Sequence, residues 1–322
     1  MMTTYIVRRL LLFIPTILIV TIIIFLLMWI VPGDTAMLIL TGNDPNEGGR
    51  VNLEDIERLR AKLGLDRPVH IQYADWIWDM VRGDLGESLW YQTPVIDELG
   101  GRFLTTMQLA VMGILMAFVV AVPLGIISAV KQDTKLDYIS RLFALLGIAM
   151  PTFLIAIVVT YILAYVFDWL PPLDYADLWE QPLTNLQQMI FPSLAIAFHD
   201  LAFTARVTRS SMLETMRDDY VRTARSKGLT EVSVIGRHAL KNALLPIITV
   251  SGYQFGRLLG GVVIVEVIFL VPGIGSMLID AIIHRDFVVI QAVVVLVAAV
   301  VMFLNLVIDI VYGVLDPRIR YQ

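Results

Sequence analysis

The sequence contains no cysteine, which excludes disulfides, thiolate metal sites and cysteine nucleophiles. Its histidines, His70, His199, His238 and His284, are scattered without the spacing of metal ligands, so we expect no catalytic metal. Charge is scarce as well, because 16% of the 322 residues are charged whereas 57% are hydrophobic. A soluble domain needs more polar surface than this, so the composition indicates an integral membrane protein.

Phosphate-binding and hydrolytic motifs are also absent. No glycine-rich turn leads to Gly-Lys followed by Ser or Thr, so the chain has no Walker phosphate loop. There is no Gly-x-Ser-x-Gly elbow and no His-Glu-x-x-His zinc helix. Any ATP used in its activity must therefore be bound by another polypeptide, and we expect no cofactor on this chain and no enzyme activity of its own.

Long apolar runs are what the sequence does contain. At 1.5 Å per residue, a helix of about 20 residues crosses a hydrocarbon layer of about 30 Å. The first run is longer than the apolar region of about 7–15 residues in a cleavable signal, which predicts a retained span. The fourth is the weakest, because His199 and Asp200 interrupt it and a central charge costs about 2.5–3.5 kcal/mol. The six predicted spans are 10–31, 105–130, 142–167, 190–207, 244–271 and 288–314.

Basic residues define the orientation of these spans. The termini and the loops on their side carry fifteen Lys or Arg residues, whereas the opposite short loops carry Arg285 alone. Cytoplasmic loops are enriched in Lys and Arg, so both termini are expected in the cytoplasm. The long segment 32–102 is then external, and its pattern predicts helices at 53–63, stopped by Gly64, and at 69–81. We therefore expect a small folded insertion outside the membrane.

The basic loop 206–243 reads as a helix-turn-helix on the cytoplasmic side. Met212, Met216 and Tyr220 have helical spacing, Gly228 suits a left-handed helix cap, and Thr230 can start a second helix. One interpretation is a loop that only contacts anionic lipid. The apolar residues Val221, Ala224 and Leu229 among the charges favour the other interpretation, a docking surface for a partner protein.

This loop resembles the EAA loop of binding-protein-dependent ABC importer permeases of the dipeptide, oligopeptide and nickel type. The general motif has Glu-Ala-Ala at the positions of Arg222, Thr223 and Ala224. Only Ala224 and Gly228 therefore match the general motif, and the resemblance rests on the form of the motif found in the peptide and nickel permeases. The segments that resemble the family are 219–229 and 237–246 in the loop, Arg8-Arg9-Leu10 with Pro32-Gly33-Asp34, 63–68 with Gln72-Tyr73, 83–88 with Pro94-Val95, and 265–275 with Arg285-Asp286-Phe287 and Gln291.

The resemblance implies an all-α type I ABC importer permease in the bacterial or archaeal cell (inner) membrane. Its expected parts are an N-terminal helix with the external insertion, 1–104, a five-helix core, 105–314, and a cytoplasmic tail, 315–322. A second homologous permease, two cytoplasmic ATPases holding ATP and Mg, and an extracytoplasmic solute-binding protein would be its partners, besides the lipid bilayer, with no nucleic acid. The solute would be a peptide, nickel, glutathione or an oligosaccharide. The residues expected to couple to the ATPases are Asp219, Tyr220, Val221, Arg222, Thr223, Ala224, Arg225, Lys227, Gly228 and Leu229.

Polar residues inside the spans are candidates for a pathway or gate. Arg257 and Glu266 are nine residues apart, about 13.5 Å along a helix, so each needs another partner. Pro123 and Pro151 can kink their spans, and the turn sequence beginning Pro272-Gly273 should break the fifth span near the external face. Ion pairs between helices or subunits are an equally good interpretation. The pathway or gate candidates are His199, Asp200, Arg257, Glu266, Pro272 and Gly273.

Two other classes of function stay open at this stage. A proton- or ion-coupled secondary carrier could use His199, Asp200, Glu266 and Asp309, and it would need no ATPase. An intramembrane enzyme could use the same acidic and histidine side chains. Co-purification of ATPase subunits would distinguish the importer from the carrier, which a proton gradient alone should drive.

Overall fold

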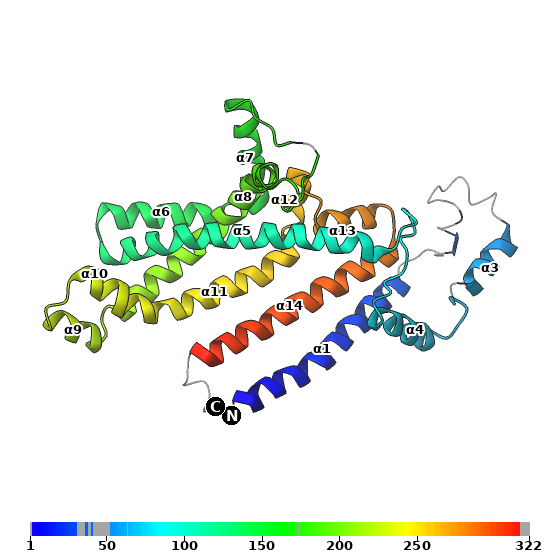
Figure 1. Ribbon diagram of the computed structural model, residues 1–322, viewed down its shortest axis with the longest axis horizontal. Coiled ribbons are helices and arrows are strands. Elements are labelled where there is room, and N and C mark those ends of the chain that lie inside the picture. Colours follow the sequence, from blue (N-terminus) through cyan, green and yellow to red (C-terminus); the bar gives the residue numbers. More distant parts are fainter. Residues whose placement is uncertain are drawn as a thin grey trace. The chain divides into compact units, whose positions relative to one another are not determined.

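The computed structural model describes residues 2–30, 36–37, 40, 52–62, 64–172 and 174–315 (Figure 1). The segment 32–34, Leu63, the tail 316–322 and the side chains of Arg8, Arg9 and Asp309 lie outside this description. The described regular structure is helical: α1 (Met2–Ile30), α3 (Leu53–Lys62), α4 (Val69–Val81), α5 (Val95–Val130), α6 (Lys135–Ala149), α7 (Thr152–Val166), α8 (Pro182–Thr215), α9 (Asp219–Ser226), α10 (Glu231–Ser233), the π-helix η1 (Val234–Ala239), α11 (Leu240–Gly261), α12 (Val263–Phe269), α13 (Ile274–Ile283) and α14 (Phe287–Leu315).

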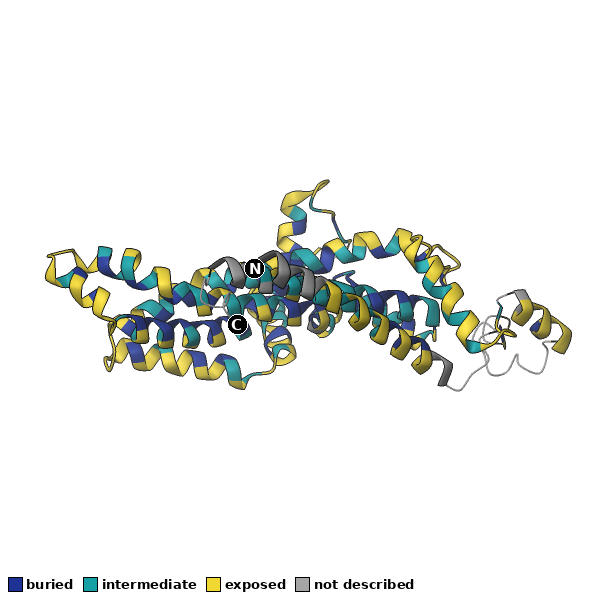
Figure 2. Cartoon of the chain, turned by 90° about the horizontal axis from the view of Figure 1, so that it is seen from below, coloured by how far each residue is buried: buried dark blue, intermediate teal, exposed yellow. Residues whose placement is uncertain are grey.

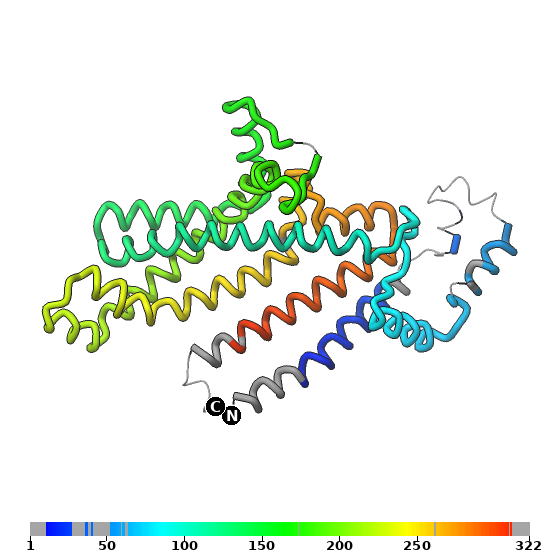
Figure 3. The backbone as a smooth tube through the Cα atoms, viewed as in Figure 1, coloured from blue at the N-terminus to red at the C-terminus, as the bar shows by residue number. Residues whose placement is uncertain are grey.

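The chain forms two compact units. Unit 1 comprises Met1–Met2, Thr105–Gly275 and Phe303–Gln322, and unit 2 comprises Thr3–Leu104 and Ser276–Met302. In unit 1, α6, α7, α11 and α12 pack on α8, and α5 and α6 fold back on each other beside it (Figure 3). Small residues let these helices approach closely, as the buried Ala195, Ala197, Ala202 and Ala205 do on α8.

The described helices confirm an all-α membrane protein, and by length and composition they supply three to five spans. Helices α5 and α8 and the stretch Phe287–Ile308 of α14 are each long and apolar enough, and two bent helix pairs can each form one more. The fourth predicted span, interrupted by His199 and Asp200, is a continuous helix of 34 residues, α8. Exposed and buried residues alternate along the long helices (Figure 2), and exposed Leu115 and Val119 on α5 suit contact with lipid. The count of six stays a prediction.

Two of the predicted spans are bent in the structure. The segment 142–167, expected as one span, is bent by 103° between α6 and α7. Pro151 is the cause, because a proline disfavours helical backbone in the residue before it, and Met150 has the extended values φ −90°, ψ 124°. The segment 244–271 is bent by 61° between α11 and α12. Pro123, by contrast, lies inside α5 without ending the helix.

The predicted insertion contains the two helices that the sequence indicates. Helix α4 has the predicted bounds, and α3 ends within one residue of the predicted end. In unit 2, α4 packs on α1 through aromatic contacts: the ring centroids of Tyr73 and Trp76 lie 5.5 and 5.7 Å from that of Phe25. The hydroxyls of Tyr73 and Thr21 also share a hydrogen bond of 2.9 Å. The first helix of the insertion after Gly64 is therefore anchored to the first predicted span.

Candidate functional site

The turn in the loop 206–243 lies between α9 and α10. Gly228 adopts φ +79°, which a residue with a side chain rarely does, and its N–H donates to the carbonyl of Arg225 at 2.9 Å. The N–H of Leu229 donates to the carbonyl of Ala224 at 3.4 Å, which completes the pattern of a Schellman cap. Thr230 is the N-cap residue of α10. The predicted left-handed cap at Gly228 and the second helix start at Thr230 are both confirmed.

The first helix of the loop differs from its prediction. Met212, Met216 and Tyr220 were expected on one helix, but α8 ends at Thr215 and α9 begins at Asp219. Residues 216–218 form the break, so the helix-turn-helix is α9, the Gly228 turn and α10. A bidentate pair joins its two helices, since Arg225 Nε lies 2.9 Å from Glu231 Oε1 and Arg225 Nη2 lies 3.4 Å from Glu231 Oε2.

Two apolar residues of α9 face the chain's own core. Val221 and Ala224 are buried in a cluster with Met212 of α8, and Ala243 of α11 belongs to the same cluster. The prediction that Val221 and Ala224 form the apolar centre of an external docking surface is therefore wrong. Their burial attaches α9 to α8 and α11. The apolar residues that remain exposed in the loop are Tyr220, Leu229 and, at 83% exposure, Val232.

The exposed face of the loop combines apolar and basic side chains. The Tyr220 hydroxyl accepts a hydrogen bond of 2.8 Å from Asn242 Nδ2, which holds the ring in place. Arg222 and Lys227 are exposed on the same short helix and its cap. We name the loop face formed by Tyr220, Arg222, Lys227, Leu229 and Val232 the outer loop face. An apolar centre with a charged rim is the usual composition of a protein interface.

A π-helix follows this turn, and no pattern in the sequence indicated it. The segment Val234–Ala239 has π-helical hydrogen bonds and leads directly into α11. Single π turns inside helices are rare and occur often at functional sites. Here the π-helix includes Arg237 and His238, the first residues of the family-like segment 237–246.

Asp200 and Arg257 form an ion pair between α8 and α11. Arg257 Nη2 donates to Asp200 Oδ1 at 2.7 Å. Gln254 Nε2 donates to the backbone carbonyl of Asp200 at 3.2 Å, and the Thr204 hydroxyl donates to Gln254 Oε1 at 2.9 Å. The prediction that Arg257 needs a partner other than Glu266 is confirmed. Spacing along the sequence could not identify that partner, because Asp200 lies on another helix.

Two buried atoms at this pair have no hydrogen-bond partner among the described residues. They are Asp200 Oδ2 and His199 Nδ1. Leaving such polar atoms unpaired away from water costs about 1–3 kcal/mol each. The Arg257 side chain is 46% exposed, so the pair reaches the surface of this chain. Asp200 Oδ2 and His199 Nδ1 are themselves enclosed, so a further polar group could reach them only if α8 or α11 moved.

Glu266 holds the bend after α12. It is fully buried and accepts a hydrogen bond of 2.6 Å from the Thr106 hydroxyl, which itself accepts one of 2.8 Å from the N–H of Ile274. A Cβ at Gly273 would lie 2.2 Å from Glu266 Oε1, so only glycine allows this approach. Leu270 has φ +56°, and Pro272 lies between α12 and α13, which confirms the predicted helix break. Burial of Glu266 within the chain makes it a structural group of this turn.

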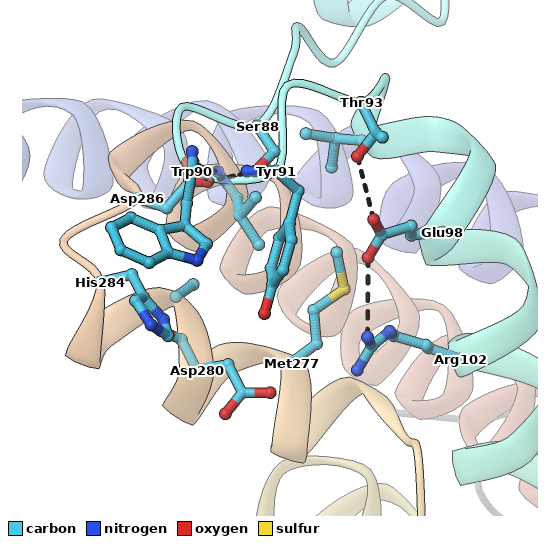
Figure 4. A pocket seen from close by; sticks show the side chains of 13 residues that line it. Ser88, Trp90, Tyr91, Thr93, Glu98, Arg102, Met277, Asp280, His284 and Asp286 are labelled. Atoms are coloured by element: carbon cyan, nitrogen blue, oxygen red, sulfur yellow. Dashed lines mark hydrogen bonds and ion pairs between the residues drawn. The ribbon is translucent and has the colours of Figure 1, made fainter. Parts of the chain in front are cut away.

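In unit 2, two of the family-like segments meet. Ser88 Oγ donates to Asp286 Oδ2 at 2.5 Å, although the two residues are 198 positions apart. The backbone N–H of Trp90 also donates to Asp286 Oδ2, at 3.3 Å. Trp90 and His284 line an adjacent pocket (Figure 4), and their ring centroids are 4.2 Å apart. Its volume of about 20 Å³ holds about one water molecule, so it is too small for a solute.

Comparison with known proteins places this architecture in a family. The model of the family described as "Binding-protein-dependent transport system inner membrane component" matches residues 121–321, and the model of the corresponding N-terminal region matches residues 2–110. The chain belongs to the binding-protein-dependent transport system inner membrane components. These inner membrane components are the permease subunits of ABC importers, so this chain is a multi-pass membrane permease rather than an enzyme.

Relatives within this family align over the whole chain. A peptide transport system permease protein of Brucella melitensis is 39% identical over 322 residues, with 100% of both chains covered. The dipeptide transport system permease protein of Alkalihalophilus pseudofirmus is 37% identical over 340 residues, covering 99% of this chain and 100% of that protein. The glutathione transport system permease protein of Escherichia coli is 38% identical over 321 residues, with 100% of both covered.

A solved structure supports the fold of this inner membrane component. The crystal structure of an amino acid ABC transporter with histidines gives a TM-score of 0.54 at 13% identity, covering 67% of this chain and 94% of that chain. At this identity the likeness extends to the arrangement of helices alone. The match is consistent with the type I importer fold expected from the sequence.

Proposed function

We propose that this permease forms one half of a transmembrane pathway for short peptides in a bacterial or archaeal inner membrane. A second homologous permease forms the other half, an extracytoplasmic binding protein delivers the solute, and two cytoplasmic ATPases bind the loop 206–243. Three aligned relatives are named for peptide, dipeptide and glutathione transport. These solutes share amide backbones and charged termini. That shared chemistry supports peptides over nickel and oligosaccharides.

The observation that carries this proposal is the two-sided construction of α9. Its buried side, Val221 and Ala224, packs with Met212 of α8 and Ala243 of α11. Its other side contributes Tyr220 and Arg222 to the outer loop face. A partner that moves the outer loop face must therefore displace the ends of α8 and α11, because closely packed side chains transmit displacement. ATP and Mg would lie on that partner.

The Asp200–Arg257 pair is the part of this chain that we assign to the solute pathway. It joins α8 to α11, the same two helices to which α9 is attached. The unpartnered Asp200 Oδ2 and His199 Nδ1 offer an acceptor for an ammonium group and a histidine nitrogen. A peptide amino terminus suits the first of these. Movement of α8 against α11 would open or close access to both atoms.

The ion-coupled carrier is the weaker explanation of the same residues. Arg257 engages Asp200 Oδ1, and Glu266 is buried at a structural turn, so these acids do not form an evident proton relay. Membership of the chain among ABC importer permeases favours ATP as the energy source. Both termini are expected in the cytoplasm, with the insertion outside.

Single cysteines test the orientation and the docking site together, because the chain has no native cysteine. Trp179 and Val232 are 85% and 83% exposed, so cysteine at either position should fold normally. In intact cells, an impermeant thiol reagent should label the Trp179→Cys variant and spare Val232→Cys. In the purified complex, Val232→Cys should cross-link to an ATPase subunit, and Trp179→Cys should not. Labelling of Val232→Cys from outside, or no cross-link to an ATPase, would refute the proposal.

A further inference from the structure

A cleft of about 450 Å³ lies between α5, α6 and α8 in unit 1. This volume is within the range of ligand sites, about 300–1,000 Å³. One part of its wall is basic and hydroxylated, and the other part is apolar. The principal lining residues are Arg141, Arg206, Arg209, Ser140, Leu124 and Leu145. No acidic residue of the described chain is among those that line it.

A fully buried carboxylate fixes two of these arginines. Arg209 Nε and Nη2 donate to Asp137 Oδ1 and Oδ2 at 2.8 and 3.0 Å. Arg141 also forms an ion pair with Asp137, and the Ser128 hydroxyl donates to Asp137 Oδ1 at 2.5 Å. The carboxylate oxygens are therefore occupied by these donors. Each guanidinium has five N–H donors, so Arg141 and Arg209 keep others for a ligand.

Arg206 supplies a third positive charge. It is exposed, and within the described part of the chain it has no hydrogen bond or ion pair. Asp137 and the exposed Asp133, which lies 3.3 Å from Arg141, neutralise at most two of the three guanidinium charges. The cleft thus has an excess of positive charge, beside hydroxyl donors and an apolar wall. Arginine forks of this kind match the geometry of phosphate.

We propose that this cleft binds the phosphate of an anionic phospholipid. Arg206 and the remaining donors of Arg141 and Arg209 would hold the phosphate, and Leu124 and Leu145 would contact the glycerol and acyl region. The apolar wall favours a lipid over free phosphate, which needs no such surface. Arg206 and Arg209 lie on the last part of α8, which is also the start of the loop 206–243, where the sequence predicts the cytoplasmic side. Basic clefts between helices on that side are typical sites for anionic headgroups.

Native mass spectrometry of the assembled importer tests this site. The complex is delipidated and then titrated with phosphatidylglycerol or phosphatidylcholine. Phosphatidylglycerol should be retained preferentially, and Arg206→Gln should weaken its binding about fivefold. This variant leaves the Asp137 contacts intact, so the fold should survive. Arg217→Gln, an equal charge change at an exposed residue between α8 and α9 that does not line the cleft, is the matched control and should bind as the unaltered complex does.

Three outcomes would overturn the proposal. The first is equal retention of phosphatidylglycerol and phosphatidylcholine, and the second is unchanged phosphatidylglycerol binding in Arg206→Gln. The third is displacement of phosphatidylglycerol by millimolar inorganic phosphate, together with equally strong binding of inorganic phosphate in the absence of lipid. That result would show that the cleft is a site for the free anion. Weakened phosphatidylglycerol binding in Arg206→Gln, with no competition by inorganic phosphate, would support the lipid.

Discussion

Replacing Gly228 with valine should uncouple ATP hydrolysis from transport while the complex stays assembled in the membrane. A β-branched side chain at φ +79° costs about 1–2 kcal/mol, and a Cβ there would meet no other atom within 4 Å. The substitution therefore changes only the backbone of the turn. The altered turn should misplace α10 and with it the Arg225–Glu231 pair. We expect stimulation of ATPase activity by the loaded binding protein, and solute uptake, to fall about tenfold. Both are measured on the reconstituted complex.

Gly236 provides a matched control for this experiment. It lies in the π-helix of the same loop, and a Cβ there also meets no atom within 4 Å, but its backbone is not in the left-handed region. Gly236→Val should therefore keep most of the stimulation by the loaded binding protein. If Gly228→Val retained unaltered stimulation and uptake, the loop would not be the coupling element. If both variants failed equally, the defect would not come from the Gly228 turn.

Breaking the Asp200–Arg257 pair should reduce uptake strongly, and removing both charges should restore part of it. Arg257→Gln leaves the fully buried Asp200 carboxylate without its ion-pair partner, so the ion pair no longer offsets the cost of burying that charge. Asp200→Asn should be milder, because Arg257 is half exposed and can reach water. We expect uptake to fall more than about tenfold in Arg257→Gln, and less in Asp200→Asn. In the variant with both substitutions, uptake should recover to within about threefold of uptake by the unaltered complex.

Uptake in these variants must be compared at equal amounts of assembled complex. Arg217→Gln is the control for loss of a positive charge, since Arg217 is exposed between α8 and α9. Additive losses in the double variant would contradict an energetic coupling between the two charges. If the pair lies in the solute pathway, Asp200→Asn should also change the uptake of peptides with a free amino terminus relative to peptides with an acetylated one. An unchanged ratio would restrict the pair to a structural role.

Local sequence patterns predicted much of the fold. Helix α4 has its predicted bounds because Pro68 sets its start and an apolar periodicity continues to Val81. Gly228 was identified from the chemistry of helix ends, and its left-handed backbone follows from the same chemistry. Pro151 was expected to kink its span. The size of the resulting bend, 103°, depends on the packing of α6 and α7 on α8, which the local sequence does not specify.

Contacts between distant residues could not be predicted in this way. Asp200 with Arg257 and Ser88 with Asp286 are separated by 57 and 198 positions, and no periodicity links them. The burial of Val221 was misjudged for a related reason. An amphipathic pattern indicates that a helix buries one face, but it does not indicate whether that face packs on the same chain or on a partner.

The most direct test of the central claim is solute uptake into proteoliposomes that contain the complete complex. The chain has no Walker phosphate loop, and its outer loop face is available to a partner, so separate ATPases are expected to supply the energy for transport. Uptake of peptide delivered by the binding protein should require hydrolysable ATP and should persist when an ionophore collapses the proton gradient. Uptake driven by a proton gradient, without ATP or the ATPase subunits, would contradict the account.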